Sequence, residues 1–281
     1  MSIGGREGSS GETSPSPSPA RTGQVESSRL YAYMLDVDED LAAGLDRRMR
    51  FAARHHATAR VLDAQSGACD LAPWLAGVGR GPGLLVMDGL LAVDTRIAER
   101  TSTELLGAGD LLAPTLLREE EMIEPHASWR ALETSRLAVL DGEFLERTRP
   151  WPQIIKSLLE RAERRTEDLS LLRVIASHPR LEVRLVLLLW HLGSRWGRVE
   201  PSGLRLTLPL THRLLGQLVA AERPSVTHAL SRLGRTGLIT GASTDLHLQG
   251  SLGTTLTALG KPHGPAARTH ARRGAAHERI A

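Results

Sequence analysis

The residues with the most informative chemistry lie between Leu208 and Ile239, where two amphipathic segments flank a short turn. The second segment carries apolar side chains at helical spacing on one face: Val226, Leu230 and Leu233. Arg223 and His228 then lie outside that face. An arginine donates two hydrogen bonds to the O6 and N7 edge of guanine, and a histidine farther along the helix can donate to another purine. The pattern therefore predicts a helix that contacts base edges.

The preceding segment has the features of a bracing helix. Thr211 can cap its first turn, and its inner face is apolar at Leu214, Leu215, Leu218 and Val219. Pro224 suits the first turn of the following helix, where its missing N–H costs little. Two such helices form a helix-turn-helix, whose second helix enters the major groove. Spacing alone also fits two amphipathic helices of an ordinary bundle.

The distribution of charge supports a polyanionic partner. The 281 residues contain 35 Lys and Arg and 32 Asp and Glu, which gives a net charge of +3. From Ser177 to the end there are 14 basic and 5 acidic residues, so the rest of the chain is acidic overall. Only Lys156 and Lys261 are lysines, and arginine favours bidentate contacts with phosphate or guanine. These counts indicate a neutral or acidic module joined to one that meets nucleic acid.

Composition excludes several other classes of protein. The 41% hydrophobic and 24% charged content is typical of globular domains and not of fibrous or wholly disordered chains. One cysteine, Cys69, excludes an intramolecular disulfide framework and an all-cysteine metal or iron–sulfur site. The start lacks the apolar core of a secretory signal, and the longest apolar run, Leu185–Trp190, is too short to cross a bilayer. We expect a cytoplasmic protein without membrane contact.

The elements that must position the DNA-reading helix follow from the rest of the pattern. Residues 30–45 have helical spacing, which predicts one or two short helices. Residues 57–141 contain short apolar runs separated by turn signals, which indicate a small barrel or sandwich. Asp88-Gly89 between two such runs predicts a hairpin. Strand-like segments at 204–208 and 246–249 bracket the two helices, which is typical of a winged module.

A long helix is predicted over 152–176. Residues on it recur by alternate steps of three and four, as in a coiled-coil seam with one charged interruption: Ile155, Leu158, Ala162, Arg165, Leu169, Leu172 and Ala176. Its flanks are highly charged, so the narrow stripe predicts pairing with a second copy of the chain. A helix packed on its own barrel is the alternative.

The segment from Leu210 to Ile239, including Gln217-Leu-Val-Ala-Ala-Glu-Arg-Pro-Ser225, resembles the DNA-binding signature of the Crp/Fnr transcription factors. The resemblance extends over about residues 30–250 and implies an α+β fold with a cyclic-nucleotide-binding-like β-roll. The expected parts are a disordered tail (1–28), a β-roll sensor (29–150), a dimerisation helix (151–177), a winged helix-turn-helix (178–251) and a basic flexible tail (252–281).

The resemblance also implies site residues. The expected DNA contacts are Arg223, Pro224, Ser225, Thr227, His228, Arg232, Thr211, Arg213 and Ser243. Arg223 falls on the family's guanine-reading arginine. Glu222 is an acid where a neutral hydroxyl would serve a phosphate better, and Pro224 replaces an acidic base-reading residue of some members, so the operator sequence does not carry over.

The predicted effector pocket departs from the cyclic-nucleotide branch of this family. Ala113-Pro114 stands where that branch has Gly-Glu, and Pro125-His126 stands near its phosphate-binding Arg-Ser. Losing this arginine removes a bidentate contact with a small anion, so cyclic AMP is not the expected effector. Haem ligation through His55, His56 or His126 stays an alternative. The pocket is expected to comprise Asp110, Ala113, Pro114, His126, Ala127 and Ser170.

No Gly-x-Ser-x-Gly elbow, P-loop or His-Glu-x-x-His motif is present, so we expect no catalysis, and no metal or other cofactor. The sequence predicts a homodimeric, sequence-specific transcription regulator that binds double-stranded DNA through helix 224–235. RNA polymerase and a small-molecule effector are further partners. The alternatives are a dimeric sensor or scaffold with a protein-binding carboxyl module, and a cyclic-nucleotide-responsive regulator.

Overall fold

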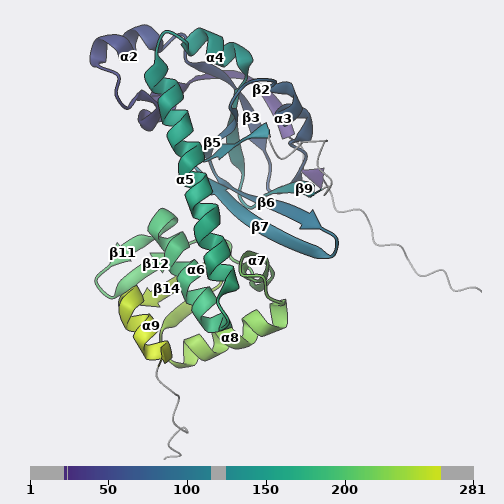
Figure 1. Ribbon diagram of the computed structural model, residues 1–281, viewed down its shortest axis with the longest axis vertical. Helices are drawn as coiled ribbons and strands as arrows, with labels where there is room; N and C mark the ends of the chain where they lie inside the picture. Colours follow the sequence, from purple (N-terminus) through teal and green to yellow (C-terminus); the bar gives the residue numbers. More distant parts are fainter. Residues whose placement is uncertain (1–21, 24, 115–124, 261–281) are drawn as a thin grey trace, which may run out of the picture. The chain divides into compact units, whose positions relative to one another are not determined.

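A computed structural model describes residues 22–23, 25–114 and 125–260 (Figure 1). The chain divides into two compact units, Met1–Glu167 and Asp168–Ala281. Most of the two expected tails, residues 1–21 and 261–281, lies outside the described residues. The boundary between the units falls inside the long helix, and not at either of its ends.

Unit 1 is built on two five-stranded sheets. The first sheet comprises, in spatial order, β1 (Thr22–Gly23), β4 (Gly67–Cys69), β9 (His126–Ala131), β6 (Leu90–Ile97) and β7 (Arg100–Gly107). The second comprises β2 (Val25–Tyr33), β3 (Thr58–Ala64), β10 (Ser135–Leu140), β5 (Gly83–Asp88) and β8 (Leu111–Leu112). The helical segments are α1 (Met34–Val37), η1 (Glu39–Ala42), α2 (Arg47–Ala53), α3 (Ala72–Gly77), α4 (Gly142–Thr148) and α5 (Pro152–Ser177).

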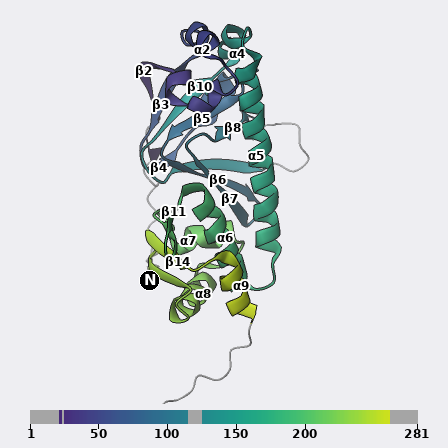
Figure 2. The ribbon, with the colours of Figure 1, turned by 90° about the vertical axis from the view of Figure 1, so that its left-hand side faces the viewer.

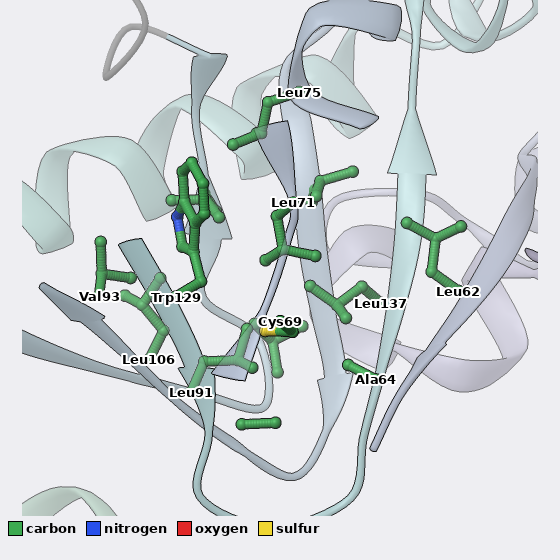
Figure 3. Packing of buried hydrophobic residues seen from close by; sticks show 14 of the residues in the cluster. Leu62, Ala64, Cys69, Leu71, Leu75, Leu91, Val93, Leu106, Trp129 and Leu137 are labelled. Carbon is green, nitrogen blue, oxygen red and sulfur yellow. The ribbon is translucent and has the colours of Figure 1, made fainter. Parts of the chain in front are cut away.

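The centre of the second sheet is buried on both faces. Leu84 and Val86 of β5 belong to a core cluster with residues of the first sheet, such as Leu91 and Trp129 (Figure 3). Leu85, between them, belongs to a second cluster that includes residues of α1, α4 and α5. Because alternate side chains of a strand point to opposite faces, an uninterrupted apolar run suits a layer covered on both sides. The sheet therefore lies between the first sheet and a helical layer.

The strands confirm the apolar runs predicted between residues 57 and 141, but the predicted hairpin and the predicted end of the first tail are wrong. Asp88-Gly89 does not form a hairpin, because β5 and β6 belong to different sheets. Gly89 has φ +90° and carries the chain from one sheet to the other. The short helical segments expected within residues 30–45 are confirmed as α1 and η1, although Leu30–Tyr33 belong to β2. The expected disordered tail through Ser28 ends too late, because β2 begins at Val25 and pairs with β3 through backbone groups, which need few apolar side chains.

The residues of the predicted seam on α5 divide between two faces of the helix. Leu158 is 3% exposed and belongs to the core of unit 1, and Arg165 binds Glu104 of β7. Leu172 is half-buried. Heptad spacing admits two neighbouring stripes on one helix, and the outer one comprises Ile155, Leu159, Ala162, Thr166 and Leu169. Its leucines, Leu159 and Leu169, are 62% and 39% exposed.

Unit 2 contains the end of α5 followed by a winged helical module. Its elements are α6 (Leu181–Trp196), β11 (Arg198–Glu200), β12 (Gly203–Leu206), α7 (His212–Leu218), α8 (Arg223–Arg235), β13 (Ile239–Ala242), β14 (Asp245–Gln249) and α9 (Leu252–Gly260). The four strands form one sheet in the order β11-β12-β14-β13.

The expected flexible tail from Leu252 onward begins with a helix, so that boundary is wrong. α9 buries Thr255 and Leu259, and Arg180 donates a hydrogen bond to the Leu259 carbonyl oxygen at 2.9 Å. The glycines and threonines of this stretch obscured the helix at the sequence level, because both residue types have low helix propensity. Packing against α6 stabilises it instead. Within the described residues, no helix has the length and apolar character needed to cross a membrane.

Candidate nucleic-acid interface

The turn between α7 and α8 is set by backbone constraints. Thr211 caps α7 and accepts a hydrogen bond from the Leu214 N–H at 3.2 Å, as predicted. A Cβ on Gly216 would lie 2.5 Å from the Ala221 carbonyl oxygen, so this position admits only glycine. Ala220 has φ +52°, a left-handed conformation that costs a non-glycine residue about 1–2 kcal/mol.

Arg184 of α6 supports this turn, and the sequence analysis missed it. Its Nη1 donates to the carbonyl oxygens of Val219 at 2.8 Å and Ala220 at 3.3 Å, where the last carbonyls of α7 lack helical partners. The same nitrogen lies 3.5 Å from the Ala176 carbonyl oxygen near the end of α5. The available signal was a charged Arg184 next to the apolar run Leu185–Trp190 of α6.

α8 separates its structural residues from its exposed ones. The buried side chains of α8 are Val226, Ala229 and Leu233, and Leu230 is only half-buried. In the predicted inner stripe, Ala229 thus takes the place expected for Leu230. Four of the expected DNA contacts are exposed near the start of the helix: Arg223, Pro224, Ser225 and His228. The first turn of α8 therefore presents polar groups and unpaired backbone N–H groups to solvent.

Two other expected contacts of α8 are engaged within unit 2. The Thr227 hydroxyl donates to the Arg223 carbonyl oxygen at 3.0 Å and lies 2.9 Å from Nδ1 of His212 on α7. Arg232 forms an ion pair with Glu182 of α6, whose side chain is 15% exposed. Both side chains hold α8 against its neighbours, and these contacts compete with a role in reading bases.

The remaining expected contacts lie around α8. Thr211 and Arg213 are exposed at the start of α7, and Ser243 is exposed in the loop between β13 and β14. The Ser243 carbonyl oxygen accepts a hydrogen bond from the Leu210 N–H at 3.2 Å, which ties this wing to the entry of α7. Within the described part of unit 2, neither Arg213 nor Arg223 has a side-chain hydrogen bond or ion pair, so both charges are free to meet a ligand.

Other arginines of unit 2 are neutralised locally. Arg205 makes a bidentate pair with Asp245 at 2.8 and 2.7 Å, and these hydrogen bonds lower the pKa of the Asp245 carboxyl. Arg195 lies 3.3 Å from Asp168. The free positive charge is thus more localised than the count of arginines suggests.

The residues of the expected effector pocket lie in several local environments. Asp110 accepts a hydrogen bond from the Gly107 N–H, Ala127 packs against the core of unit 1, and His126 is exposed at the start of β9. Ala113 and Pro114 are half-buried, and Ser170 is exposed in unit 2. Residues 115–124, between the two halves of the expected cassette, lie outside the described residues.

A cavity of about 250 Å³ in unit 1 has a different lining, which includes Met34, Leu85, Gly109 and Arg161. His55 and His56, considered as haem ligands, make ring contacts with Tyr33 and Trp151 respectively. Across residues 22–23, 25–114 and 125–260, no group of three or more His, Cys, Asp or Glu side chains could hold a metal ion.

Comparison with known proteins gives the carboxyl-terminal module a family. Residues 183–248 match the Crp-like helix-turn-helix domain. A CooA mutant from Carboxydothermus hydrogenoformans is similar in fold, with a TM-score of 0.55 at 17% identity over 71% of this chain and 87% of that one. No curated protein matches the sequence.

Two further solved structures have the same fold. FixK2 from Bradyrhizobium japonicum has a TM-score of 0.52 at 13% identity, over 71% of this chain and 96% of that one. The c-di-GMP responsive global regulator CLP from Xanthomonas campestris has a TM-score of 0.51 at 17% identity, over 71% and 98%. At these identities the likeness establishes the fold, with a sheet-rich amino-terminal unit and a helix-turn-helix module.

We predict that Ala220→Gly stabilises unit 2 by about 0.5–1 kcal/mol, because glycine adopts the left-handed conformation without the steric cost. Thermal unfolding of the full chain measures the gain. Ala221→Gly is the matched control, since Ala221 has no positive φ, and it should destabilise by about 0.5–1 kcal/mol through the added freedom of the unfolded chain. Equal effects of the two variants would contradict this account of the turn.

We also predict that α6 loses stability as the pH falls below about 6.5. Burial lowers the pKa of His191 from its ordinary value of 6.5, although Asp168 opposes this shift. As the pH falls, His191 therefore takes up a proton in the unfolded chain before it does so in the folded chain, and this difference favours unfolding in acid. Hydrogen exchange of the α6 amides between pH 7.5 and 5.5 tests this, and His191→Gln should reduce the dependence whereas the exposed His228→Gln should not. An unchanged profile in His191→Gln would assign the dependence to another group.

Proposed function

We propose, from the premise that this chain has a Crp-like helix-turn-helix domain and the fold of the Crp/Fnr regulators, that it binds DNA sequence-specifically and regulates transcription. The main support for this proposal is the exposure of Arg223 and His228 near the start of α8. Among the described residues, the Arg223 side chain has no hydrogen-bond or ion-pair partner, while Thr227 and Arg232 hold the helix in place. A fixed helix with free donors at its first turns suits the major groove. Such a regulator would act in the cytoplasm.

The exposed residues fall into those that would contact bases and those that would contact phosphates. Arg223 would bind guanine through both its terminal nitrogens, and His228 would donate to a second base farther along the groove. Arg213, Thr211 and Ser243 lie outside α8 and would contact phosphates, which orients the module without reading sequence. Glu222, the N-cap residue of α8, is exposed and would repel phosphate, so it is excluded from this set.

We further propose that the chain works as a homodimer through the outer stripe of α5, comprising Ile155, Leu159, Ala162, Thr166 and Leu169. Alternate steps of four and three keep these side chains on one seam. Ile155 is half-buried and the other four are exposed, so the stripe is available to a second copy. A two-fold dimer would present two copies of α8 to two half-sites of an operator.

We expect Arg223→Ala to weaken binding to the preferred DNA by about 1–3 kcal/mol and to relax one base preference, because the guanine contact is lost. Arg213→Ala should weaken all sequences alike and lower the salt slope by about one. Fluorescence anisotropy with operator fragments, selected from a genomic library, measures both. If Arg223→Ala weakens specific and nonspecific binding equally, Arg223 is not a base reader.

Leu159→Glu should shift the chain from twice its 30.5 kDa mass to the monomer mass in sedimentation equilibrium, since a charge would enter the apolar seam. Val199→Glu is the control, because Val199 is 84% exposed on β11 and lies outside the seam. Leu158, buried within its own unit, is unsuited to this test. Dimers of unchanged stability in Leu159→Glu would place the interface elsewhere.

A further inference from the structure

Two arginines of α5 bind the β-roll of their own unit. Arg161 donates to the Gly109 carbonyl oxygen and to the Asp38 carboxylate, the latter at 2.6 Å, with its side chain only 3% exposed. Arg165, one turn later, makes a bidentate pair with Glu104 of β7, with both nitrogen–oxygen distances at 2.8 Å. Charge-assisted bidentate pairs are among the strongest hydrogen bonds in proteins, because both geometry and charge are matched.

The Arg165–Glu104 pair lies beside β8, the strand that leads into the expected effector pocket. Nη1 of Arg165 lies 3.3 Å from the Leu111 carbonyl oxygen, and the charge of Asp110 helps to raise the pKa of Arg165. Figure 2 shows α5 alongside β5 and β8 in this region. A guanidinium of the chain itself therefore bridges the β-roll and the helix at this point.

The pair is well shielded from water. The Arg165 and Glu104 side chains are 15% and 14% exposed. Burial alone would lower the pKa of Arg165, yet the hydrogen bonds to Glu104 raise it above its ordinary value. By contrast, the Arg136–Asp88 pair between β10 and β5 is 54% and 44% exposed, which makes it a natural control within the same unit.

We propose that the Glu104–Arg165 pair, supported by Arg161, takes the place of an effector and holds α5 in its DNA-binding arrangement without a bound small molecule. The inference rests on the proposed function. α5 is continuous from Pro152 to Ser177, and Asp168, three residues after Arg165, pairs with Arg195 in unit 2. Arg165 and Glu104 are thus positioning residues: they act on DNA binding through the helix.

The test compares DNA affinity with folding stability in the full chain. Glu104→Gln and Arg165→Met each leave one partner unpaired, whereas the double variant Glu104→Leu/Arg165→Met removes both charges and should recover thermal stability. Affinities are measured at a temperature where circular dichroism shows each variant folded, on a fragment selected with wild type, with and without 1 mM cyclic AMP or cyclic GMP. Asp88→Asn, which breaks the exposed pair, is the matched control.

We expect wild type and Asp88→Asn to bind the fragment equally without nucleotide, and both single variants to bind about tenfold more weakly. The double variant should stay about tenfold weaker although its stability recovers. Affinity that recovers with stability would assign the pair to folding alone and overturn the inference. Wild-type binding that appears only with a nucleotide would also overturn it and leave the proposed function standing. No sequence preference in any sample would overturn both.

Discussion

Arg161 and Arg165 determine how α5 is rotated about its own axis. Both guanidinium groups bind the β-roll, Arg161 near Gly109 and Arg165 near Leu111, so the helix face between them must point inward. Leu158 lies on that inward face and enters the core, and the neighbouring stripe with Leu159 is left outside. The two arginine contacts and the burial of Leu158 therefore agree on the face of α5 that points inward. Because the arginines satisfy buried carboxylates and carbonyls, removing either would leave unpaired groups in a shielded place.

Unit 2 uses the same device at its helix-turn-helix. Arg184 reaches from α6 to the carbonyls at the end of α7, and Glu182 of the same helix pairs with Arg232 of α8. One mostly apolar helix thus contributes two charged side chains, two residues apart, that orient both helices of the motif. The geometry of the reading helix depends on α6 as much as on the turn itself, where Ala220 adopts an unfavourable conformation.

Much of this architecture follows from local sequence patterns. Apolar runs located the strands, and helical spacing with a Thr211 cap and Pro224 located α7 and α8. The errors share one physical origin, which is that local patterns do not reveal partners distant in sequence. Asp88-Gly89 has the composition of a hairpin turn but joins two sheets, and heptad spacing on α5 was compatible with either of two adjacent stripes. From the sequence, Arg232 is a free cation on the polar face of α8, but in the fold it forms an ion pair with Glu182 of α6.

The same reasoning explains the mixed outcome for the DNA-binding set. Exposure of Arg223 and His228 agrees with their expected role, because a helix with a strong apolar face must expose the other. Thr227 and Arg232 share that polar face, and only tertiary contacts separate bracing residues from free ones. The effector pocket depended on a resemblance at its weakest stretch, and part of that cassette lies outside the described residues.

The separation of structural from exposed residues within α8 affects how the DNA specificity of such a protein can change in evolution. The buried Val226, Ala229 and Leu233 and the bonded Thr227 and Arg232 keep the helix in place, and none of them needs the identity of the residues at 223, 225 or 228. Duplicated copies of the gene could therefore exchange those three exposed positions and acquire new target sites while the scaffold stays intact. Recognition would evolve on a surface that the fold leaves unconstrained.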